Sequence, residues 1–399
     1  MHILVFNAGS SSLKCHLFDW TGVAEHDTPK SAIWRAHVDW SRRSAPARMT
    51  IESAASAKIE EEISKPEIAS ILRRLAETLP ASPELACHRI VHGGSLFAHA
   101  AELTPEAQRK AMTFNHFAPS HNPIQLEIVD DAEVLFGPKV RQFGVFDTAF
   151  HATLPPEEYV LPGPHHWRDR GIRRYGFHGI SHQNVSRRTA QLLGRDLRDL
   201  RLITAHLGNG CSLAAIAGGI SVATTMGFTP LDGLVMGTRS GSIDPGILIH
   251  LVRQHGYSAE MLDAELNKES GLKGISGISG DMREVLDAAA SGNNDAQLAF
   301  DIFTGSVARH VAGLVTALGG LDALVFTAGI GENSPEVRDA VARKLRFMGI
   351  EIDQEVNNSK PIDQVISKTG TRPLMLAVRS EEDWEIARQC FAAAGSVLC

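Results

Sequence analysis

The chain has 399 residues, of which 43% are hydrophobic and 21% charged, and its formal net charge is −7. This length suits two domains or one duplicated domain, and the composition is that of a globular enzyme. The acidic balance argues against general binding of nucleic acid, which needs a basic surface. We therefore expect positive charge for an anionic ligand to come from individual arginine and lysine residues that lie beside glycines.

Cysteine usage and hydropathy predict the compartment. The five cysteines stand singly, without a CxxC pair, at positions 15, 87, 211, 390 and 399. This pattern argues against a disulfide framework or a zinc site and favours a reducing cytoplasm. The N-terminal residues lack the pattern of a signal peptide, and no run of about 18 apolar residues predicts a membrane span. We expect a cytoplasmic protein without a membrane partner.

The predicted elements alternate between strands and helices, which is typical of an α/β fold. Residues 3–6 predict a buried strand, residues 7–12 a polar turn, and residues 13–18 the second strand of a hairpin. Residues 21–60 show no regular pattern. Further along the chain we expect strands at 143–146, 202–205, 212–216 and 321–326, and helices at 66–79, 186–194 and 295–318, from Pro335 and after residue 383.

Residues 202–216 repeat the shape of residues 3–18: an apolar strand, a polar glycine turn and a returning strand. Two unrelated glycine-rich hairpins could also produce this likeness. As a duplication, it predicts two homologous halves that face each other across a cleft. No linker rich in Pro or Ser separates them. Motif placement puts one half at residues 1–147 plus 381–399 and the other at residues 148–380.

Three glycine-rich loops each follow a predicted strand, at Asn7–Lys14, His206–Gly210 and Gly329–Asn333. Small residues let backbone N–H groups approach phosphate oxygens closely. For each loop alone a plain tight turn is the more ordinary interpretation, but three such loops after strands favour phosphate binding. The chain has no Walker A sequence and no GxGxxG loop with its acidic partner, which argues against P-loop and Rossmann folds.

Arginine and histidine lie beside glycine in three further segments, at residues 88–94, 173–182 and 236–241. The planar guanidinium suits carboxylate and phosphate oxygens, although a surface arginine near a turn is the alternative for each segment. His178 and His182 have the spacing of zinc ligands on a helix. Because no Glu lies between them and Gly179 interrupts the helix, we do not expect a metal there.

Acidic residues occur at two further positions of interest. Asp147 ends an apolar strand, where it could contact a metal or a substrate, or cap a helix. The run Glu381–Asp383 precedes the last predicted helix, and its ordinary role is to cap that helix and complement its dipole.

Six segments resemble the signature sequences of acetate kinases and occur in that family's order. They are NAGSSSLK (7–14), HRIVHGG (88–94), RRYGFHGISH (173–182), HLGNGCSL (206–213), MGFTPLDGLVMGTRSGSIDPG (226–246) and TAGIGENS (327–334). The family belongs to the actin, sugar kinase and Hsp70-type superfamily. The resemblance implies two ribonuclease-H-like (actin-like ATPase) halves facing an ATP cleft. It also implies a cytoplasmic homodimer that transfers phosphoryl groups between ATP and acetate, with Mg²⁺ or, as an alternative, Mn²⁺.

The resemblance implies roles for the matching residues. Asn7 and Glu382 would hold the metal, and Arg89 the substrate carboxylate. His178 and Arg239 would stabilise the transition state, and Asp147 is the family's assigned acid/base. The residues implied in lining the acyl pocket are Val91, Ser120 and Pro230. Those implied in nucleotide binding are Lys14, His206, Leu207, Gly208, Asn209, Gly210, Asp281, Met282, Arg283, Gly329, Ile330, Gly331, Glu332 and Asn333.

Two departures from the family pattern bear on function. The family usually has leucine where this chain has Ser120, so we expect a larger, less apolar acyl pocket that admits propionate more readily. The family's late Asn-Glu-Glu segment reads Glu381–Asp383 here, which keeps the carboxylate assigned to the metal.

The ionisation of a carboxylic acid substrate predicts which charged residues the reaction needs. A small carboxylic acid is already ionised at neutral pH, so a general base is unnecessary when the acyl phosphate forms. We therefore expect Asp147 to orient the metal or the cation that carries the substrate, and not to move a proton. Arg89, Arg239 and Mg²⁺ would then offset the repulsion between the two anions.

Three alternatives stay open from the sequence. A propionate kinase or a broad short-chain carboxylate kinase shares these segments, and substrate kinetics would separate them. A non-catalytic ATP-binding module would not need the charged residues that are retained here. A sugar kinase would need a base for its hydroxyl nucleophile more than paired arginines.

Overall fold

The computed structural model describes residues 1–9, 12–23, 28–40, 46–53, 56–63 and 67–396. Contacts divide the chain into two compact units, Met1–Ala152 with Glu381–Cys399, and Thr153–Ser380. The first boundary lies beyond the predicted one at 147/148, because Ala149 packs with Ile90 and Phe146 in a core cluster of the first unit. Ser10, Ser11 and Cys399, which the sequence analysis considered, lie outside the described residues.

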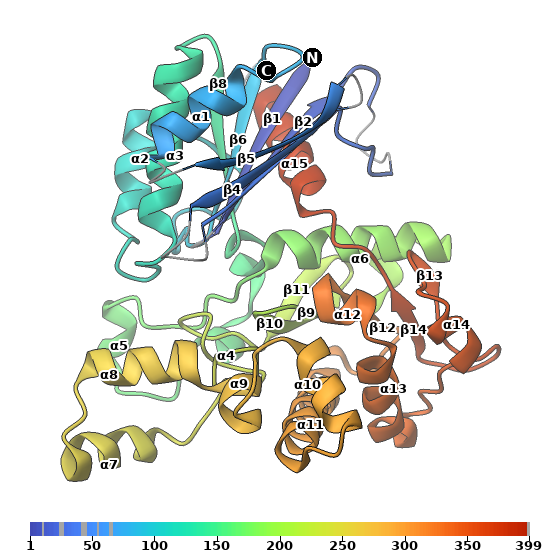
Figure 1. Ribbon diagram of the computed structural model, residues 1–399. Coiled ribbons are helices and arrows are strands. Elements are labelled where there is room, and N and C mark those ends of the chain that lie inside the picture. The colour runs from blue at the N-terminus through green and yellow to red at the C-terminus, as the bar shows by residue number, and fades with distance from the viewer. Residues whose placement is uncertain (10–11, 24–27, 41–45, 54–55, 64–66, 397–399) are drawn as a thin grey trace. The chain divides into compact units, whose positions relative to one another are not determined.

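The first unit is built on a mixed sheet in the order β5-β4-β3-β2-β1-β6-β8-β7 (Figure 1). β1, β6 and β8 run parallel, and the other pairs are antiparallel. The strands are β1 (His2–Ala8), β2 (Ser12–Asp19), β3 (Trp34–Asp39), β4 (Ala47–Ser53), β5 (Ser56–Ile63), β6 (Leu85–Ile90), β7 (Ala101–Glu102) and β8 (Arg141–Phe146). The helices are α1 (Ile68–Ala76), α2 (Pro105–Met112), α3 (Asn122–Phe136) and α15 (Glu382–Ser396).

Strands β3, β4 and β5 correct the sequence analysis, which expected no regular structure over residues 21–60. In β3, buried Trp34, Ala36 and Val38 alternate with exposed or half-buried residues. The same alternation occurs in β4. A period-two pattern of three apolar positions is too short to stand out in one sequence, because pairing with β2 supplies most of its stability.

The second unit contains a sheet in the order β11-β10-β9-β12-β14-β13. Its strands are β9 (Arg201–Leu207), β10 (Cys211–Ala217), β11 (Ile220–Thr224), β12 (Ala323–Thr327), β13 (Gln364–Val365) and β14 (Leu374–Ala377). Its helices are α4 (Pro156–Tyr159), α5 (His166–Asp169), α6 (Gly179–Leu193), α7 (Pro245–His255), α8 (Ala259–Ala264), α9 (Gly271–Ser276), α10 (Met282–Ala290), α11 (Asn294–Leu318), α12 (Ala328–Asn333), α13 (Pro335–Lys344) and α14 (Gln354–Asn358).

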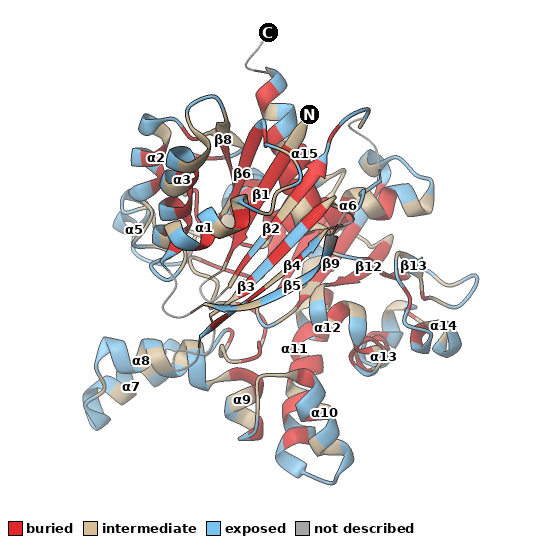
Figure 2. Ribbon diagram, turned by 45° about the horizontal axis from the view of Figure 1, so that its top comes forward, coloured by how far each residue is buried: buried red, intermediate tan, exposed pale blue. Residues whose placement is uncertain are grey.

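The two sheets share a five-strand topology. The order β3-β2-β1-β6-β8 in the first unit matches β11-β10-β9-β12-β14 in the second. In each sheet, three strands form an antiparallel meander, and two further strands continue the sheet beside the first strand of that meander, β1 or β9. These two strands run parallel to β1 or β9. Buried residues concentrate in these strands (Figure 2). The α/β prediction is therefore confirmed, and the weak sequence repeat reflects a repeated topology.

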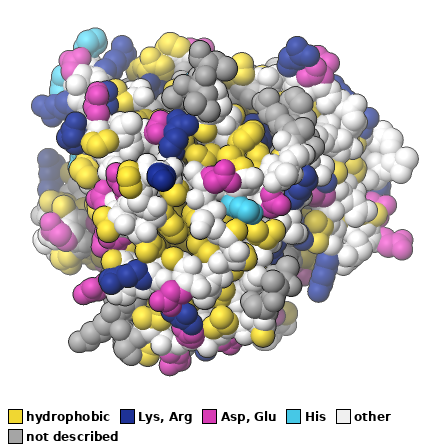
Figure 3. Space-filling view, turned by 90° about the horizontal axis from the view of Figure 1, so that it is seen from above, with side chains coloured by type: hydrophobic (Ala, Val, Ile, Leu, Met, Phe, Trp, Pro, Cys, Tyr) yellow, Lys and Arg dark blue, Asp and Glu magenta, His cyan; other side chains and the backbone are white. Residues whose placement is uncertain are grey.

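Helix α11 is long and apolar enough to cross a membrane by length and composition, with a mean hydropathy of 1.2. It packs against the second sheet and against α9, α10 and α13, with Phe303, Val307 and Val311 fully buried. A core helix passes the same test of length and composition, and we interpret α11 as one. On the face drawn in Figure 3, basic and acidic side chains are interspersed and neither sign covers the described surface.

A buried arginine holds the short helix α12 in place. Arg338 of α13 is fully buried and donates hydrogen bonds to the carbonyl oxygens of Gly331 (2.9 Å) and Glu332 (2.8 Å). It also donates to the side chain of Asn357 in α14 (2.8 Å) and to its carbonyl oxygen (2.9 Å). Burial lowers the pKa of Arg338 to about 10. The guanidinium therefore ties α12, α13 and α14 together.

We predict that Arg338→Met strongly destabilises the second unit. Buried acceptors left without a donor cost about 1–3 kcal/mol each, so thermal unfolding should occur roughly 5–15 °C lower in calorimetry. The matched control is Arg343→Met on the same helix, where the side chain is 72% exposed. Equal midpoints for the two variants would contradict this role of Arg338.

Candidate active site

Three polar side chains lie at the carboxyl ends of the parallel strands of the first unit. Asn7 is in β1, Arg89 in β6, and Asp147 directly follows β8. The register pairs Phe6 with His88, and Arg89 with Val145. Because side chains alternate between the faces of a strand, Asn7, Arg89 and Asp147 point to one face of the sheet. The open edge where parallel strands end is where α/β proteins usually bind ligands.

Arg89 and Asp147 form a two-point ion pair. Nε of Arg89 donates to Oδ1 (3.0 Å) and Nη2 donates to Oδ2 (2.6 Å), and the Asp147 side chain is only 3% exposed. Burial raises the pKa of Asp147, against the opposing charge of Arg89. For Arg89, burial works to lower the pKa, but Asp147 and Glu382 hold it above its ordinary value. The raised pKa of Asp147 favours a neutral carboxyl group, whereas the raised pKa of Arg89 favours a charged guanidinium. Because the two-point hydrogen-bond geometry is that of a guanidinium with a carboxylate, we interpret the contact as an ion pair at neutral pH.

The amide of Asn7 is held between an acid and a base. Its Oδ1 accepts from Nη1 of Arg89 (3.1 Å), and its Nδ2 donates to Oδ1 of Asp383 (2.8 Å). Because a guanidinium only donates and a carboxylate only accepts, these partners fix the orientation of the amide. Oδ2 of Asp383 lies 2.9 Å from Nδ1 of His16. Burial works to raise the pKa of Asp383, but the contacts with His16, Asn7 and Lys14 lower it overall.

Asp383 and His16 are site residues that sequence reasoning missed. The sequence predicts a metal ligand in the acidic run Glu381–Asp383, but the resemblance assigns that role to Glu382 and none to Asp383. The signal for His16 is its position in β2, because His16 and Lys14 share the face of Asn7, which is paired with Lys14. Lys14 itself is exposed.

The two predicted metal ligands both lie near the guanidinium of Arg89. Oε2 of Glu382 lies 4.0 Å from Nη1 of Arg89, the nitrogen that also contacts Oδ1 of Asn7. Within the described residues, no group of three or more His, Cys, Asp or Glu side chains could hold a metal. One carboxylate and one amide oxygen fit Mg²⁺, which keeps most of its ligands as water and substrate phosphate. The residues therefore fit a metal that is bound together with the nucleotide.

Helix α3 supports the segment that follows Arg89. The side chain of Gln125 accepts from the N–H of Val91 (2.9 Å) and donates to the carbonyl oxygen of Ala8 (2.6 Å). Asn122 accepts from the N–H of His92 (3.0 Å) and donates to its carbonyl oxygen (2.9 Å). Val91 is buried, and Ser120 is exposed in the turn before α3. The loops after β1 and β6 are thus fixed by one helix.

In the second unit, His178 has a strained backbone. It precedes α6 with φ 55° and ψ 25°, a left-handed conformation that is uncommon outside glycine and that is often found at functional sites. Its Nδ1 lies 2.9 Å from Oγ of Ser212. Its ring stacks on His206, with the ring centres 4.1 Å apart and the planes 17° apart. The Ser212 hydroxyl and the His206 ring therefore both restrict the orientation of this imidazole.

Arg239 and His178 converge on Gly210. A Cβ atom on Gly210 would lie 3.2 Å from Nη1 of Arg239 and 3.4 Å from Nε2 of His178. Nη1 of Arg239 also donates to the carbonyl oxygen of Pro230 (3.1 Å). Burial lowers the pKa of Arg239 and raises that of the neighbouring Cys211 thiol to about 12, so this thiol stays neutral. In the described part of the chain, no carboxylate lies within ion-pair distance of Arg239, which leaves its charge available to an anion.

Gly237 packs too closely to admit a side chain, whereas Gly208 is in ordinary van der Waals contact with its neighbours. A Cβ atom on Gly237 would contact Oδ1 of Asn209 and lie 2.9 Å from the carbonyl oxygen of Gly280. A Cβ atom on Gly208 would lie 3.8 Å from Cβ of Ala328. The structure thus brings the turn at His206–Gly210 together with the segment before Asp281 and the start of α12.

Several predicted nucleotide-binding side chains make local structural contacts. Gly329–Asn333 was expected to be a loop but lies in the short helix α12. There Oε1 of Glu332 accepts from the N–H groups of Ala328 (2.8 Å) and Ser380 (2.9 Å), and Asn333 donates to the carbonyl oxygen of Gly329 (2.9 Å).

The predicted segment Asp281–Arg283 divides between a cap, the core and solvent. Asp281 accepts from the N–H of Arg283 (2.9 Å) and so caps α10. Met282 is buried, and the Arg283 side chain is 87% exposed. The nucleotide-binding role of these two segments stays a prediction.

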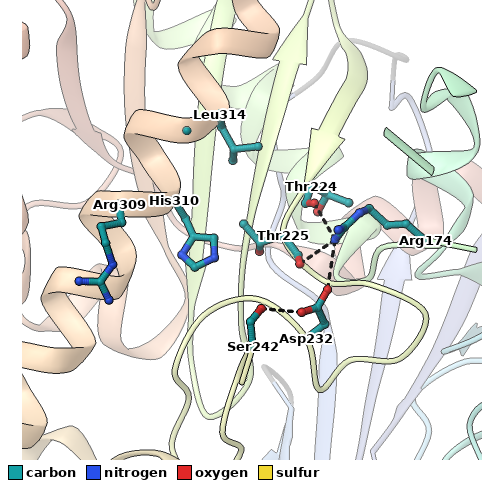
Figure 4. Close-up of a pocket in the computed structure, with 9 residues that line it drawn as sticks. Arg174, Thr224, Thr225, Asp232, Ser242, Arg309, His310 and Leu314 are labelled. Atoms are coloured by element: carbon teal, nitrogen blue, oxygen red, sulfur yellow. Dashed lines mark hydrogen bonds and ion pairs between the residues drawn. The ribbon is translucent and has the colours of Figure 1, made fainter. Parts of the chain in front are cut away.

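Arg174 fixes the loop that carries Pro230 and Arg239. Its Nη1 donates to the carbonyl oxygens of Thr225 (2.9 Å) and Met226 (3.0 Å) and lies 3.4 Å from Oδ2 of Asp232. Figure 4 shows this cluster beside a cavity of about 330 Å³ between the loop and α11. The cavity is lined by Arg174, Thr224, Thr225, Asp232, Ser242, Arg309, His310, Gly313 and Leu314. Arg174 of the segment 173–182 thus has a structural role.

Comparison with known proteins matches the chain to a family. The model of the acetokinase family matches residues 2–388. The chain belongs to the acetokinase family. It is 46% identical to the acetate kinase of Gloeobacter violaceus and 45% identical to that of Nostoc punctiforme, over 98% of this chain and 99% of each relative. Members of the family with these names are phosphotransferases, in agreement with the function expected from the signature segments.

Solved structures of the acetokinase family share the fold. The crystal structure of Porphyromonas gingivalis acetate kinase gives a TM-score of 0.89 at 36% identity, over 98% of this chain and 99% of that chain. A propionate kinase from Francisella tularensis gives 0.89 at 35% identity, over 97% and 98%. The expected fold class is therefore confirmed.

We predict that Arg89→Ala and Arg239→Ala each lower kcat/KM for phosphoryl transfer by about 30- to 1,000-fold, which corresponds to losing one charged contact worth about 2–4 kcal/mol. Circular dichroism and thermal unfolding should report an intact fold. The matched control is Arg198→Ala, where the side chain is 84% exposed and forms an ion pair with Asp196, two residues away. Near-control turnover in either variant would remove that arginine from the site.

Proposed function

We propose that the protein catalyses direct, reversible transfer of the γ-phosphoryl group between ATP and acetate, giving ADP and acetyl phosphate. The observation that carries this proposal is Arg239, a half-buried guanidinium that meets His178 over Gly210 without a carboxylate partner among the described residues. A site built to hold a neutral ligand would not leave such a charge uncompensated.

The main barrier to this reaction is the approach of two anions. Acetate is ionised at neutral pH, and the γ-phosphoryl group carries its own negative charge. Arg89 would hold the acetate carboxylate, while Arg239 and a hydrogen bond from His178 would stabilise charge on the transferring group. Asn7 and Glu382 would hold Mg²⁺ or Mn²⁺, which supplies charge neutralisation when it is bound with ATP. The turn at His206–Gly210 and the backbone around Gly329 would contact the nucleotide.

Asp147 is proposed as a positioning residue. Both of its carboxylate oxygens are engaged by Arg89, at 3.0 and 2.6 Å. A carboxylate in this state holds a guanidinium in a fixed orientation and has little basicity left for a proton. The nucleophile also has no proton to give at neutral pH. Asp147 would therefore act through Arg89 and not as a general base.

A short-chain carboxylate kinase with wider specificity is the second candidate. One solved relative of similar TM-score is described as a propionate kinase. Val91, Ser120 and Pro230 remain the proposed acyl-pocket residues, and Ser120 is exposed at the start of α3. Serine in place of the family's leucine favours space for one more methylene.

We also propose a homodimer in the cytoplasm. The described cysteines are unbonded, which suits a reducing compartment. Helix α7 buries none of its residues and exposes Ile247, Ile249 and Val252 at 47–52%. Ile249 and Val252, three residues apart, share one side of the helix, and Ile247 lies on another. Exposed apolar side chains of this kind are typical of a surface covered by another chain. Sedimentation at assay concentrations tests the homodimer.

The function is tested with ATP, Mg²⁺ and straight-chain acids of two to four carbons, trapping the acyl phosphate with hydroxylamine. The proposal expects hydroxamate from acetate and formation of ADP that depends on the acid. ATP binding without hydroxamate from any acid would instead favour a non-catalytic nucleotide-binding protein, and phosphorylation of a sugar would favour a sugar kinase.

We predict that Ser120→Leu lowers the ratio of kcat/KM for propionate over acetate by about three- to fivefold. Leucine would fill space that otherwise buries one methylene, which is worth about 0.8 kcal/mol. The matched control is Ser82→Leu, an exposed serine of the same unit. A ratio that rises or stays at the control value would mean that Ser120 does not line the acyl pocket.

A further inference from the structure

A line of hydrogen bonds runs behind His178 inside the second unit. Nδ1 of His178 lies 2.9 Å from Oγ of Ser212, which lies 2.8 Å from Nε2 of His182. Nδ1 of His182 lies 2.7 Å from Oγ1 of Thr204. Thr204 is in β9 and Ser212 in β10, and the register of these strands places both on the face covered by α6, which carries His182. Thr204, His182 and Ser212 are each fully buried.

We infer that Thr204, His182 and Ser212 are positioning residues that fix His178 as the neutral tautomer with its proton on Nε2. This inference rests on the proposed function for its consequence, but the tautomer itself is a property of the free protein. The sequence predicts strands that contain Thr204 and Ser212 but gives neither side chain a role in the site, and it raises His182 only as a metal ligand.

Thr204, at the end of the line away from His178, sets the direction in which its hydrogen bonds donate. Among the residues that the structure describes, Nδ1 of His182 is the hydrogen-bond partner of the Thr204 hydroxyl. If His182 carried its proton on Nδ1, the Thr204 O–H would be a buried donor without an acceptor, which costs about 1–3 kcal/mol. Thr204 therefore donates to Nδ1 of His182, and the proton of neutral His182 is on Nε2.

The remaining two bonds follow from the first. Nε2–H of His182 donates to Oγ of Ser212, so the Ser212 hydroxyl must direct its own proton elsewhere. In the described structure its other partner is Nδ1 of His178. Ser212 therefore donates to Nδ1 of His178, and the proton of neutral His178 is on Nε2. Each hydroxyl and each imidazole donates once along the line and accepts from the group behind it.

The same hydrogen bonds favour a neutral His178, whose ring is stacked on that of His206 with the ring centres 4.1 Å apart. A positive charge on His178 would require a proton on Nδ1, where it would displace the Ser212 hydroxyl proton and reverse the line. The neutral ring keeps all three hydrogen bonds and still presents a donor at Nε2, the atom that faces Gly210.

This arrangement gives the transferring phosphoryl group a donor that does not depend on protonating His178. A fixed donor aimed at developing charge is effective because it needs no reorganisation during the reaction. A histidine free to exchange tautomers would present a lone pair to phosphate oxygen in part of the population, and a lone pair there repels the anion.

The tautomers can be read directly by long-range proton–nitrogen correlation spectroscopy on protein labelled with ¹⁵N-histidine. Signals are assigned from the His178→Gln and His182→Gln variants. We expect both His178 and His182 of the unliganded protein to be protonated on Nε2 and unprotonated on Nδ1 at neutral pH. A proton on Nδ1 of either residue would overturn the inference, whether or not the protein is an active kinase.

Two variants test the far end of the line. Thr204→Val keeps the shape of the side chain and removes its hydroxyl, so Nδ1–H forms should appear at both histidines. Thr204→Ser restores the hydroxyl and should restore the natural tautomers. The matched control is Thr189→Val, which removes another fully buried hydroxyl, one that donates to the carbonyl oxygen of Val185 in α6. Unchanged tautomers in Thr204→Val would contradict the inference. If that variant does not fold, Ser212→Ala interrupts the line next to His178 and is judged by the same signals.

Kinetics then connect the tautomer with the reaction. We expect Thr204→Val to lower kcat by about three- to tenfold with little change in KM, because only part of the population loses a donor whose complete removal costs about 100- to 1,000-fold. A changed tautomer with unchanged kcat would contradict the expected effect of the line of hydrogen bonds on catalysis. Absence of kinase activity in the natural protein would contradict the proposed function while leaving the tautomer assignment intact.

Discussion

The ion pair between Arg89 and Asp147 is the interaction on which the site of the first unit depends. A guanidinium taken out of water is stable only when its donors are met, and the carboxylate of Asp147 meets two of them. Asn7 accepts from a third, and this leaves the amide nitrogen of Asn7 to be satisfied by Asp383. One half-buried cation therefore connects three strand ends to Asp383 in the first turn of α15, which lies 376 residues from Asn7 in the chain.

The two arginines of the proposed site are held in opposite ways. The charge of Arg89 is already balanced by the carboxylate of Asp147. A substrate anion must therefore share the guanidinium with Asp147, so that Arg89 orients the anion more than it strengthens binding. Arg239 has a carbonyl oxygen as its partner at 3.1 Å and a glycine beneath it, so an anion that reaches it meets an uncompensated charge. This difference suggests that Arg89 orients the acyl carboxylate, while Arg239 and His178 act on the charge that changes during transfer.

Much of the fold was predictable, because the signals were local. The hairpins at residues 3–18 and 202–216, the helix at 295–318 and the strand-end position of Asp147 each rest on a pattern within a few residues. Strands β3 to β5 were missed because their alternation is short. Asp383, His16, Thr204 and Ser212 could not be found from spacing, because their roles arise from contacts between elements far apart in the chain. The side chain of Glu332 likewise could not be assigned to the cap of α12 before the helix was known.

The most direct test of the account is a double-mutant cycle on Arg89 and Asp147, with kcat/KM measured for acyl phosphate formation at saturating Mg²⁺. If Asp147 acts through Arg89, Asp147→Asn lowers kcat/KM in the natural protein but has little or no effect in the Arg89→Ala background, giving a coupling free energy of about 1–3 kcal/mol. If Asp147→Asn causes the same loss in both backgrounds, Asp147 acts independently of Arg89, and the central claim that it positions a cation is contradicted.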